Sequence, residues 1–252
     1  MSAGSAEHAG NAFVSRLLDL LVPSLCLVCE SPRRASGGGG VCAACWESLP
    51  RVDPGRACPR CALPDAGGLC ASCLRDPFPA RSAAAFAAYQ DGTVPLVGAF
   101  KFRGYDLLAE PAGRRLAALA KERGLDGADR VVPIPSTARR NRERGYDPAV
   151  LLARATARAL RLGFAPLLTR TRDTPAQSRL PASRRLANVR GALSASPRSR
   201  GRSILLVDDV VTTGATARVA AEALRDAGAA RVDVLCFART PALDDSRRPE
   251  GS

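Results

Sequence analysis

Two adjacent carboxylates follow a run of apolar residues that begins at Ile204. A strand that is apolar along its whole length is what a parallel sheet buried on both faces requires. Open α/β sheets bind their ligands at the carboxyl ends of such strands. Asp208 and Asp209 stand at that end, where they can accept hydrogen bonds from the two vicinal hydroxyls of a ribose. The pattern therefore predicts a sugar-binding position directly after the apolar run.

The turn after the two acids has the composition of an anion-binding loop. Its residues are Thr212, Thr213, Gly214, Ala215 and Thr216. They lead into a predicted helix, whose free N–H groups and positive dipole end favour a phosphate. Gly214 removes a Cβ from the approach of the backbone to that phosphate. The structural alternative is a strand that merely ends in acids and a helix capped by threonine, but it does not require the acids, the threonines and the glycine together.

A cluster of arginines follows a second apolar segment, residues 131–135, which is bounded by prolines. Arg139, Arg142 and Arg144 can hold a diphosphate through charge-assisted hydrogen bonds, because a guanidinium presents a fork of donors that matches phosphate oxygens. A solvated basic loop, or an overhang at a helix N-terminus, is the structural alternative. We place the three arginines in the expected phosphosugar-binding set.

Eight of the nine cysteines form four Cys-x-x-Cys pairs before residue 74. Each pair makes a tight knuckle, and two knuckles complete a tetrahedral site of four thiolates for Zn²⁺. The assigned sets are Cys26, Cys29, Cys42 and Cys45 for one site and Cys58, Cys61, Cys70 and Cys73 for the other. Crossed pairing, redox-active pairs and an iron–sulfur cluster are the alternatives. Since four ligands leave no open position, the predicted zinc is structural, and this region needs it to fold.

The composition limits the class of protein. Of the 252 residues, 46% are apolar, which is enough for a packed core. The formal net charge of +13 is carried almost entirely by arginine and suits phosphorylated ligands or nucleic acid, although a GC-rich genome that favours arginine over lysine explains it equally well. No run of eighteen apolar residues and no secretion signal is visible, so we expect a cytoplasmic protein.

Strand and helix signals alternate after residue 80, which predicts βαβ units and a parallel sheet. The expected strands are 84–89, 130–134, 164–168, 203–207 and 231–237, and the expected helices are 107–123, 148–160 and 215–227. We expect Gly163 to end the helix before it. Residues 171–202 are polar and rich in arginine. The predicted fold is an α/β domain with a parallel sheet over residues 80–240, preceded by a small cysteine-rich zinc domain over residues 13–78, whose first residues form a short helix.

Residues 204–216 resemble the motif with which type I phosphoribosyltransferases bind 5-phosphoribosyl 1-diphosphate (PRPP). The resemblance implies that Asp208 and Asp209 bind the ribose 2′ and 3′ hydroxyls and that residues 212–216 cradle the 5′-phosphate. It also implies Mg²⁺ as a companion of PRPP. The order of the cysteine pairs, Cys42–Trp46, Lys101–Gly104 and Pro133–Gly145 further resembles the ComF family of competence-associated proteins. One departure is Tyr146-Asp147, where that family more often has Phe-Asn.

The ComF resemblance implies a double zinc ribbon joined to a type I phosphoribosyltransferase domain. It implies either transfer of a ribosyl 5-phosphate to an unknown acceptor or PRPP-responsive handling of single-stranded DNA in uptake or recombination, with competence or recombination proteins as partners. Residues 171–202 would then close over PRPP and bring Arg184 or Arg185 to the diphosphate, so that Arg185 joins the two acids as a catalytic residue; an inert surface loop is the alternative. Lys101 is explained equally well by a solvated turn. Aromatic residues make up only 4% of the chain, which argues against a base-stacking platform.

Overall fold

The computed structural model of the protein describes residues 25–32, 40–102, 106–171 and 191–242. Within these residues a five-stranded sheet has the order β1-β7-β6-β2-β3, and all neighbouring strands are parallel. The strands are β1 (Ala83–Ala88), β2 (Arg130–Pro133), β3 (Gly163–Phe164), β6 (Ser203–Val211) and β7 (Arg231–Arg239). A separate antiparallel pair joins β4 (Leu168–Arg170) to β5 (Leu193–Ala195). The predicted α/β fold with a parallel sheet is confirmed.

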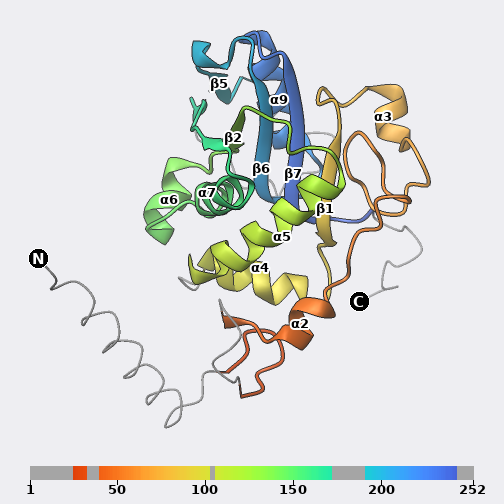
Figure 1. Cartoon of the computed structure of the whole chain (residues 1–252), viewed down its shortest axis with the longest axis vertical. Helices are drawn as coiled ribbons and strands as arrows, with labels where there is room; N and C mark the ends of the chain where they lie inside the picture. Colours follow the sequence, from red (N-terminus) through yellow and green to blue (C-terminus); the bar gives the residue numbers. More distant parts are fainter. Residues whose placement is uncertain (1–24, 33–39, 103–105, 172–190, 243–252) are drawn as a thin grey trace, which may run out of the picture.

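Helices cover both faces of this sheet (Figure 1). The helices of the described residues are α2 (Ala43–Glu47), α3 (Ala71–Arg75), α4 (Thr93–Phe102), η2 (Asp106–Leu108), α5 (Ala109–Glu122), α6 (Ala138–Arg144), α7 (Pro148–Leu160), η4 (Pro197–Ser199) and α9 (Ala215–Asp226). Leu205 and Val207 of β6 pack in one core with α4, α5 and α7. Ile204 and Leu206 pack in a second core with α9. Because strand side chains alternate between the two faces, β6 needs apolar residues at successive positions, as predicted.

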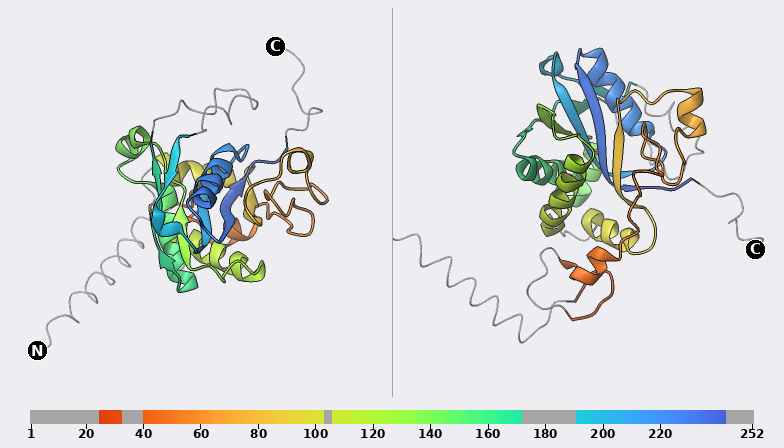
Figure 2. Two further views of the ribbon diagram at one scale, coloured as in Figure 1. Left: turned by 90° about the horizontal axis from the view of Figure 1, so that it is seen from above. Right: turned by 45° about the vertical axis from the view of Figure 1, so that its right-hand side comes forward.

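The two cysteine-containing segments contact opposite faces of the sheet. Trp46 of α2 packs edge-on against Phe237 of β7, with ring centroids 6.1 Å apart, in the core that contains α4 and α5. Phe78, which follows α3, belongs to the core that contains α9. Figure 1 and the right-hand view of Figure 2 show α2 and α3 apart from each other, with α3 beside β1. Each cysteine segment therefore packs on a different face of the sheet.

The connection between the two cysteine segments pairs with the outer edge of β1. The Val52 N–H donates to the Phe86 carbonyl at 3.2 Å, and the Ala88 N–H donates to the Pro50 carbonyl at 2.8 Å. The Arg51 guanidinium lies 3.9 Å above the centroid of the Phe86 ring. This pairing covers backbone groups that an edge strand otherwise leaves open to another chain.

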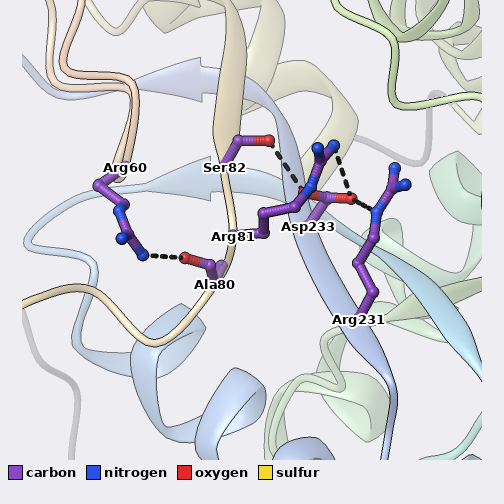
Figure 3. Close-up of polar contacts among 6 residues, drawn as sticks. All are labelled: Arg60, Ala80, Arg81, Ser82, Arg231 and Asp233. Atoms are coloured by element: carbon purple, nitrogen blue, oxygen red, sulfur yellow. Dashed lines mark hydrogen bonds and ion pairs between the residues drawn. The ribbon is translucent and has the colours of Figure 1, made fainter. Parts of the chain in front are cut away.

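A buried carboxylate anchors the entry into β1 (Figure 3). Asp233 of β7 is fully buried. It accepts hydrogen bonds from three side chains, Ser82 Oγ at 2.9 Å, Arg81 Nε at 3.0 Å and Arg231 Nε at 2.6 Å. Surrounding a buried charge with donors in this way offsets the free energy lost when it leaves water. The chain that leaves the second cysteine segment is thus fixed to β7, the strand next to β1.

The strand expected over residues 203–207 does not end at Val207 but continues as β6 to Val211, because its later residues still pair with β7. The helix expected over residues 148–160 is confirmed as α7. Its C-cap is Arg161, which adopts the left-handed conformation (φ 58°), so the expected role of Gly163 in ending the helix was wrong and Gly163 instead begins β3. The expected strand 164–168 is divided between β3 and β4.

The sequence did not predict the elements α2, α3, α4, α6, β5 and η4, the last two of which lie in the region 171–202. The predicted helix near residues 13–21 lies outside the described residues. Among the helices that are described, none has the length and apolarity that a membrane crossing demands.

Candidate functional site

Asp208 and Asp209 lie in the part of β6 that extends beyond its neighbour β2. The pairing of β2 with β6 ends at Pro133 and Val207, while the pairing of β6 with β7 continues to Val211. Within the described residues, one edge of β6 therefore has no strand partner at the two acids. The Asp208 side chain gives one backbone donor near this edge a hydrogen-bond partner, because its Oδ1 accepts the Asp209 N–H at 2.9 Å. The acids stand at the carboxyl end of a central strand, where ligands of open α/β sheets bind.

Two cations from other elements lie beside the acids. Lys101, in the last turn of α4, places Nζ 3.2 Å from Asp209 Oδ2. Arg144, the last residue of α6, is close enough to Asp209 that the carboxylate opposes the fall in the pKa of Arg144 that burial causes. The structure thus gathers residues from α4, α6 and β6 at one position. The ion pair of Lys101 was not expected, since the sequence explained that lysine equally well as part of a solvated turn.

The acidic pair is electrostatically strained. Burial, and next the negative charge of Asp209, raise the pKa of Asp208 well above its ordinary value, while the Lys101 ammonium works against this shift. A cation or a set of hydroxyl donors placed at the two carboxylates would relieve the repulsion. Perturbed carboxyls of this kind gather at functional sites.

The predicted phosphate loop is a turn between β6 and α9. Gly214 precedes α9 with φ 82° and ψ 0°, in the left-handed region. A Cβ on Gly214 would meet the Phe78 ring only at 3.5 Å, so the backbone conformation, rather than crowding, is what requires glycine. Thr212 and Thr213 are exposed, Ala215 is buried and Thr216 is half-buried. Thr213 Oγ1 accepts the Ala215 N–H at 3.4 Å. A side chain of the loop therefore pairs with the first N–H group of α9.

The arginine cluster forms the helix α6 rather than an open loop. Thr137 caps its start by accepting the Arg140 N–H, and Gly145 ends it with φ 78°. Arg139 is exposed and pairs with Glu143 at 3.1 Å along the helix. Arg142 is also exposed. Of the three arginines assigned to a diphosphate, the structure brings Arg144 next to the acids, while Arg139 and Arg142 occupy the exposed surface of α6.

Asp147 fixes α6 to its neighbours. Its carboxylate accepts hydrogen bonds from the Ser136 N–H at 2.9 Å, the Ala149 N–H at 3.0 Å and Asn141 Nδ2 at 3.2 Å. It therefore joins the turn after β2, the interior of α6 and the start of α7. The adjacent Tyr146 hydroxyl donates to the Phe100 carbonyl of α4. The carboxylate in place of an amide thus serves to hold the arginine helix in position.

The eight paired cysteines form the two predicted groups of four, and within each group the sulfur atoms lie within 4.8 Å of one another. Cys29 Sγ and Cys42 Sγ are 3.9 Å apart, and Cys61 Sγ and Cys70 Sγ are 3.6 Å apart. A tetrahedron with Zn–S bonds of about 2.3 Å requires sulfur atoms about 3.8 Å apart. Both groups therefore fit zinc, and they have the uncrossed pairing that we assigned although the spacing alone left crossed pairing open.

Backbone N–H groups favour the thiolate form of two of these sulfur atoms, which is the form that binds a cation. The Cys42 N–H points to Cys26 Sγ at 3.4 Å, and the Cys70 N–H points to Cys58 Sγ at 3.5 Å. Burial raises the pKa of Cys26 and of Cys58, but backbone hydrogen bonds outweigh it and lower the two values to about 6 and about 7. Burial and neighbouring thiols raise the pKa of Cys61 to about 11, since four thiolates cannot share a site without a cation.

Arg184 and Arg185, assigned to loop closure and catalysis, lie outside the described residues, so the structure adds nothing to that expectation. Cys236 is buried in β7, as expected for a core thiol. The sequence analysis missed Arg239 at the end of β7, which is buried and contacts the loop carbonyls. A signal was present, because an arginine directly after an apolar strand stands at the same sheet edge as the two acids.

Comparison with known proteins agrees with this two-part arrangement. A family model described as phosphoribosyl transferase domain matches residues 147–248, and one described as double zinc ribbon domain matches residues 17–74. Among solved structures, a glutamine phosphoribosylpyrophosphate (PRPP) amidotransferase from B. subtilis complexed with ADP and GMP is 25% identical, with a TM-score of 0.35; the match covers 50% of this chain and 26% of that chain.

Two relatives match over most of their lengths. The DNA utilization protein YhgH of Escherichia coli (strain K12) is 35% identical over 228 residues, which are 88% of this chain and 99% of YhgH. Competence protein ComFC of Bacillus subtilis (strain 168) is 28% identical over 197 residues, which are 75% of this chain and 80% of ComFC. The chain therefore belongs to the ComF family, in which a double zinc ribbon precedes a phosphoribosyl transferase domain.

Proposed function

We propose that this protein binds Mg²⁺-PRPP at the carboxyl end of β6 and transfers its ribosyl 5-phosphate to a nucleophile. The observation that carries the proposal is the position of Asp208 and Asp209 on the unpaired edge of β6, directly before the loop that ends at Gly214. In this arrangement one end of the site accepts hydrogen bonds and the other donates them. A phosphorylated sugar presents the complementary groups in the same order.

Each part of the site has a role in this proposal. Asp208 and Asp209 accept hydrogen bonds from the ribose hydroxyls, and the N–H groups and hydroxyls of residues 212–216 donate to the 5′-phosphate. Arg144 and Lys101 supply positive charge where the diphosphate leaves, with Arg139 and Arg142 further out on α6 and Arg185 assigned to loop closure. Mg²⁺ would be held mainly by oxygens of PRPP and by the acids, since it prefers oxygen ligands.

The proposed reaction exchanges one bond at C1 of the ribose. The bond from C1 to the diphosphate oxygen breaks and its electron pair leaves with diphosphate. A lone pair of the nucleophile, such as a ring nitrogen, forms the new bond to C1, and the proton on that nitrogen passes to solvent. The side chains contribute position and charge stabilisation rather than a covalent intermediate.

A second candidate function is PRPP-responsive handling of single-stranded DNA, in uptake or recombination. The observation that favours it is Phe102, which is 73% exposed and carries the Arg144 guanidinium 4.7 Å from its ring centroid. An exposed ring beside a basic helix can stack a base while arginines contact the backbone phosphates. The names of the relatives, DNA utilization protein and competence protein, support this candidate. Competence or recombination proteins would then be its partners, in the cytoplasm.

One experiment tests the shared part of both functions. Calorimetric titration of the zinc-loaded protein with PRPP and Mg²⁺ should give saturable binding, and the double substitution Asp208→Asn with Asp209→Asn should abolish it. Unchanged affinity of the double variant would refute the assigned site. Release of diphosphate from PRPP in the presence of a panel of bases then supports the transferase. Salt-dependent binding of labelled single strands without any turnover supports the second function.

We also propose a division of labour along the chain. Residues 13–78 form a double zinc ribbon that supports the fold, and residues 80–240 carry the phosphosugar site. The positions of the two cysteine groups and of the acids support this division.

A further inference from the structure

Arg239 connects the phosphate loop with the second cysteine group. It is the last residue of β7 and is only 4% exposed. One nitrogen of its guanidinium donates to the Val211 carbonyl at 3.2 Å and also to the Thr212 carbonyl. Its Nε donates to the Cys61 carbonyl at 3.1 Å. A single buried cation therefore contacts both the start of the loop and the knuckle that contains Cys61.

The contacts of Arg239 determine which way the loop amides point. In a planar trans peptide the carbonyl of one residue and the N–H of the next point in opposite directions. The Val211 carbonyl faces β7, where it also accepts the Thr240 N–H at 3.0 Å. The N–H groups of Thr212 and Thr213 must therefore point away from Arg239. Holding these two carbonyls prepares the following amides to donate to a phosphate, and the buried positive charge favours the same anion.

A second arginine ties the same cysteine segment to the start of α9. Arg218 donates to the Asp76 carbonyl at 2.8 Å and to the Pro77 carbonyl at 3.0 Å. Its own N–H donates to the Gly214 carbonyl, as the first turn of α9 requires. The Phe78 ring lies within 3.5 Å of the place where a Cβ of Gly214 would stand. The segment after Cys73 thus packs directly against the loop.

The contacts of Arg239 therefore link the knuckle that contains Cys61 directly to the start of the loop at Val211. The knuckle containing Cys58 and Cys61 is ordered around its metal, because each structural zinc site is organised by the ion it binds. A change in the Cys61 backbone on loss of zinc moves the acceptor that fixes Arg239. Arg239 then no longer holds the Val211 and Thr212 carbonyls in one orientation.

We propose that Arg239 is a positioning residue that couples zinc in the second cysteine group to phosphate binding by the loop. The inference rests on the proposed function, because it requires PRPP as the ligand of that loop. Zinc at Cys58, Cys61, Cys70 and Cys73 strengthens PRPP binding. Since coupling between two binding sites is reciprocal, bound PRPP must strengthen retention of the same zinc ion.

The reciprocal effect provides a test on the unmodified protein. Zinc release to a chromogenic chelator is followed with and without PRPP and Mg²⁺. PRPP should slow the release of one of the two zinc equivalents by about tenfold, within the usual range of coupling between sites, and leave the other unchanged. Equal release rates, in a protein that calorimetry shows to bind PRPP, would overturn the coupling. If the zinc-loaded protein binds no PRPP, the proposed function itself fails.

Substitution separates positioning from folding. Arg239→Lys keeps the charge but loses the fork of donors, and we expect it to weaken PRPP binding about tenfold and to abolish the PRPP effect on zinc release. The matched control is Arg60→Met in the same knuckle, because Arg60 donates to the Ala80 carbonyl, away from the loop (Figure 3). The control should bind PRPP like the unmodified protein. Wild-type PRPP affinity and zinc protection in Arg239→Lys would overturn the role of Arg239.

Discussion

Lys101 Nζ and Asp209 Oδ2 lie 3.2 Å apart, although one residue is in the last turn of α4 and the other is near the end of β6. The ammonium partly offsets the charge of both acids, since it also works against the rise in the pKa of Asp208. It therefore favours the ionised form of Asp208 at the place where hydroxyl donors are expected. This ion pair makes Lys101 part of the site.

Replacing Lys101 with methionine tests this role. Without the ammonium the pKa of Asp208 must rise further, because the cause that lowers it is lost. An ionised carboxylate accepts hydrogen bonds more strongly, and at both oxygens, than a protonated one, so PRPP affinity should fall as the pH is lowered through that pKa. We expect Lys101→Met to move the midpoint of this fall to a higher pH, measured as the PRPP Kd between pH 5.5 and 8. Lys121→Met on α5 is the control, and an unmoved midpoint in Lys101→Met contradicts the assignment.

Asp208→Asn should stabilise the fold while it removes binding. Burial and the charge of Asp209 raise the pKa of Asp208 in the folded chain. A carboxyl with a raised folded-state pKa stabilises the fold at low pH, and this contribution is lost as the pH rises through that pKa. Above that pKa the ionised group therefore destabilises the fold, and there the asparagine should raise the free energy of unfolding by about 1 kcal/mol.

The pH dependence of that gain is the critical measurement. Urea unfolding of Asp208→Asn and of the unmodified protein over a range of pH should give a difference that shrinks as the pH falls through the pKa of Asp208. PRPP affinity should drop by about 100-fold, equal to about 3 kcal/mol for a lost charged acceptor. A variant that is less stable than the unmodified protein at pH 8 would show that Asp208 serves the fold instead.

The sequence predicted the parts of the site that a local pattern encodes. Asp208, Asp209 and the turn at Gly214 follow from an apolar strand that leads into a helix. The four Cys-x-x-Cys pairs follow from spacing, which left their combination into two groups open. The partners of these residues could not be read in the same way. Lys101 reaches Asp209 and Arg239 reaches Cys61 only through the packing of α4, β6 and β7, which leaves no periodic trace in the sequence. The exact end of β6 depends likewise on its register with β7.

Substitution of two glycines should separate loop geometry from core packing. Gly214→Ala places a side chain at φ 82°, where an L-residue is strained by about 1–2 kcal/mol, with room for the Cβ itself. Gly113→Ala instead places a Cβ 2.5 Å from the Ala155 Cβ between α5 and α7, which should cost about 1–3 kcal/mol of stability by overpacking. When PRPP affinity is measured for the folded fraction of each variant, only Gly214→Ala should bind more weakly than the unmodified protein. Weakened binding by folded Gly113→Ala would contradict the assignment of the loop as the phosphate site.

Zinc content should match the two cysteine groups. We expect two zinc ions per chain by elemental analysis, and one after Cys58→Ser, because each group offers four sulfur ligands. Chelation should lower the thermal unfolding temperature, since the metal stabilises only the folded chain. Cys236→Ser is the control, because that thiol is buried in β7 away from both groups. Iron with visible absorbance in place of zinc would instead identify a cluster.

Phe102 offers the sharpest distinction between the two proposed functions. Its ring is 73% exposed beside Arg144, and Leu107 is 71% exposed in the connection that follows. If a base stacks on Phe102, Phe102→Ala should weaken binding of single-stranded DNA by about 1–3 kcal/mol. It should change the PRPP Kd less, because in the proposed site the ring supports Arg144 without contacting PRPP. Leu107→Ala removes a similar apolar area without a π-face and should have no such effect, because stacking needs the ring. Equal losses of DNA affinity in both variants would mean that this surface contributes only apolar contact. If Phe102→Ala instead fails to release diphosphate from PRPP, the ring would be assigned to binding a base acceptor of the transferase.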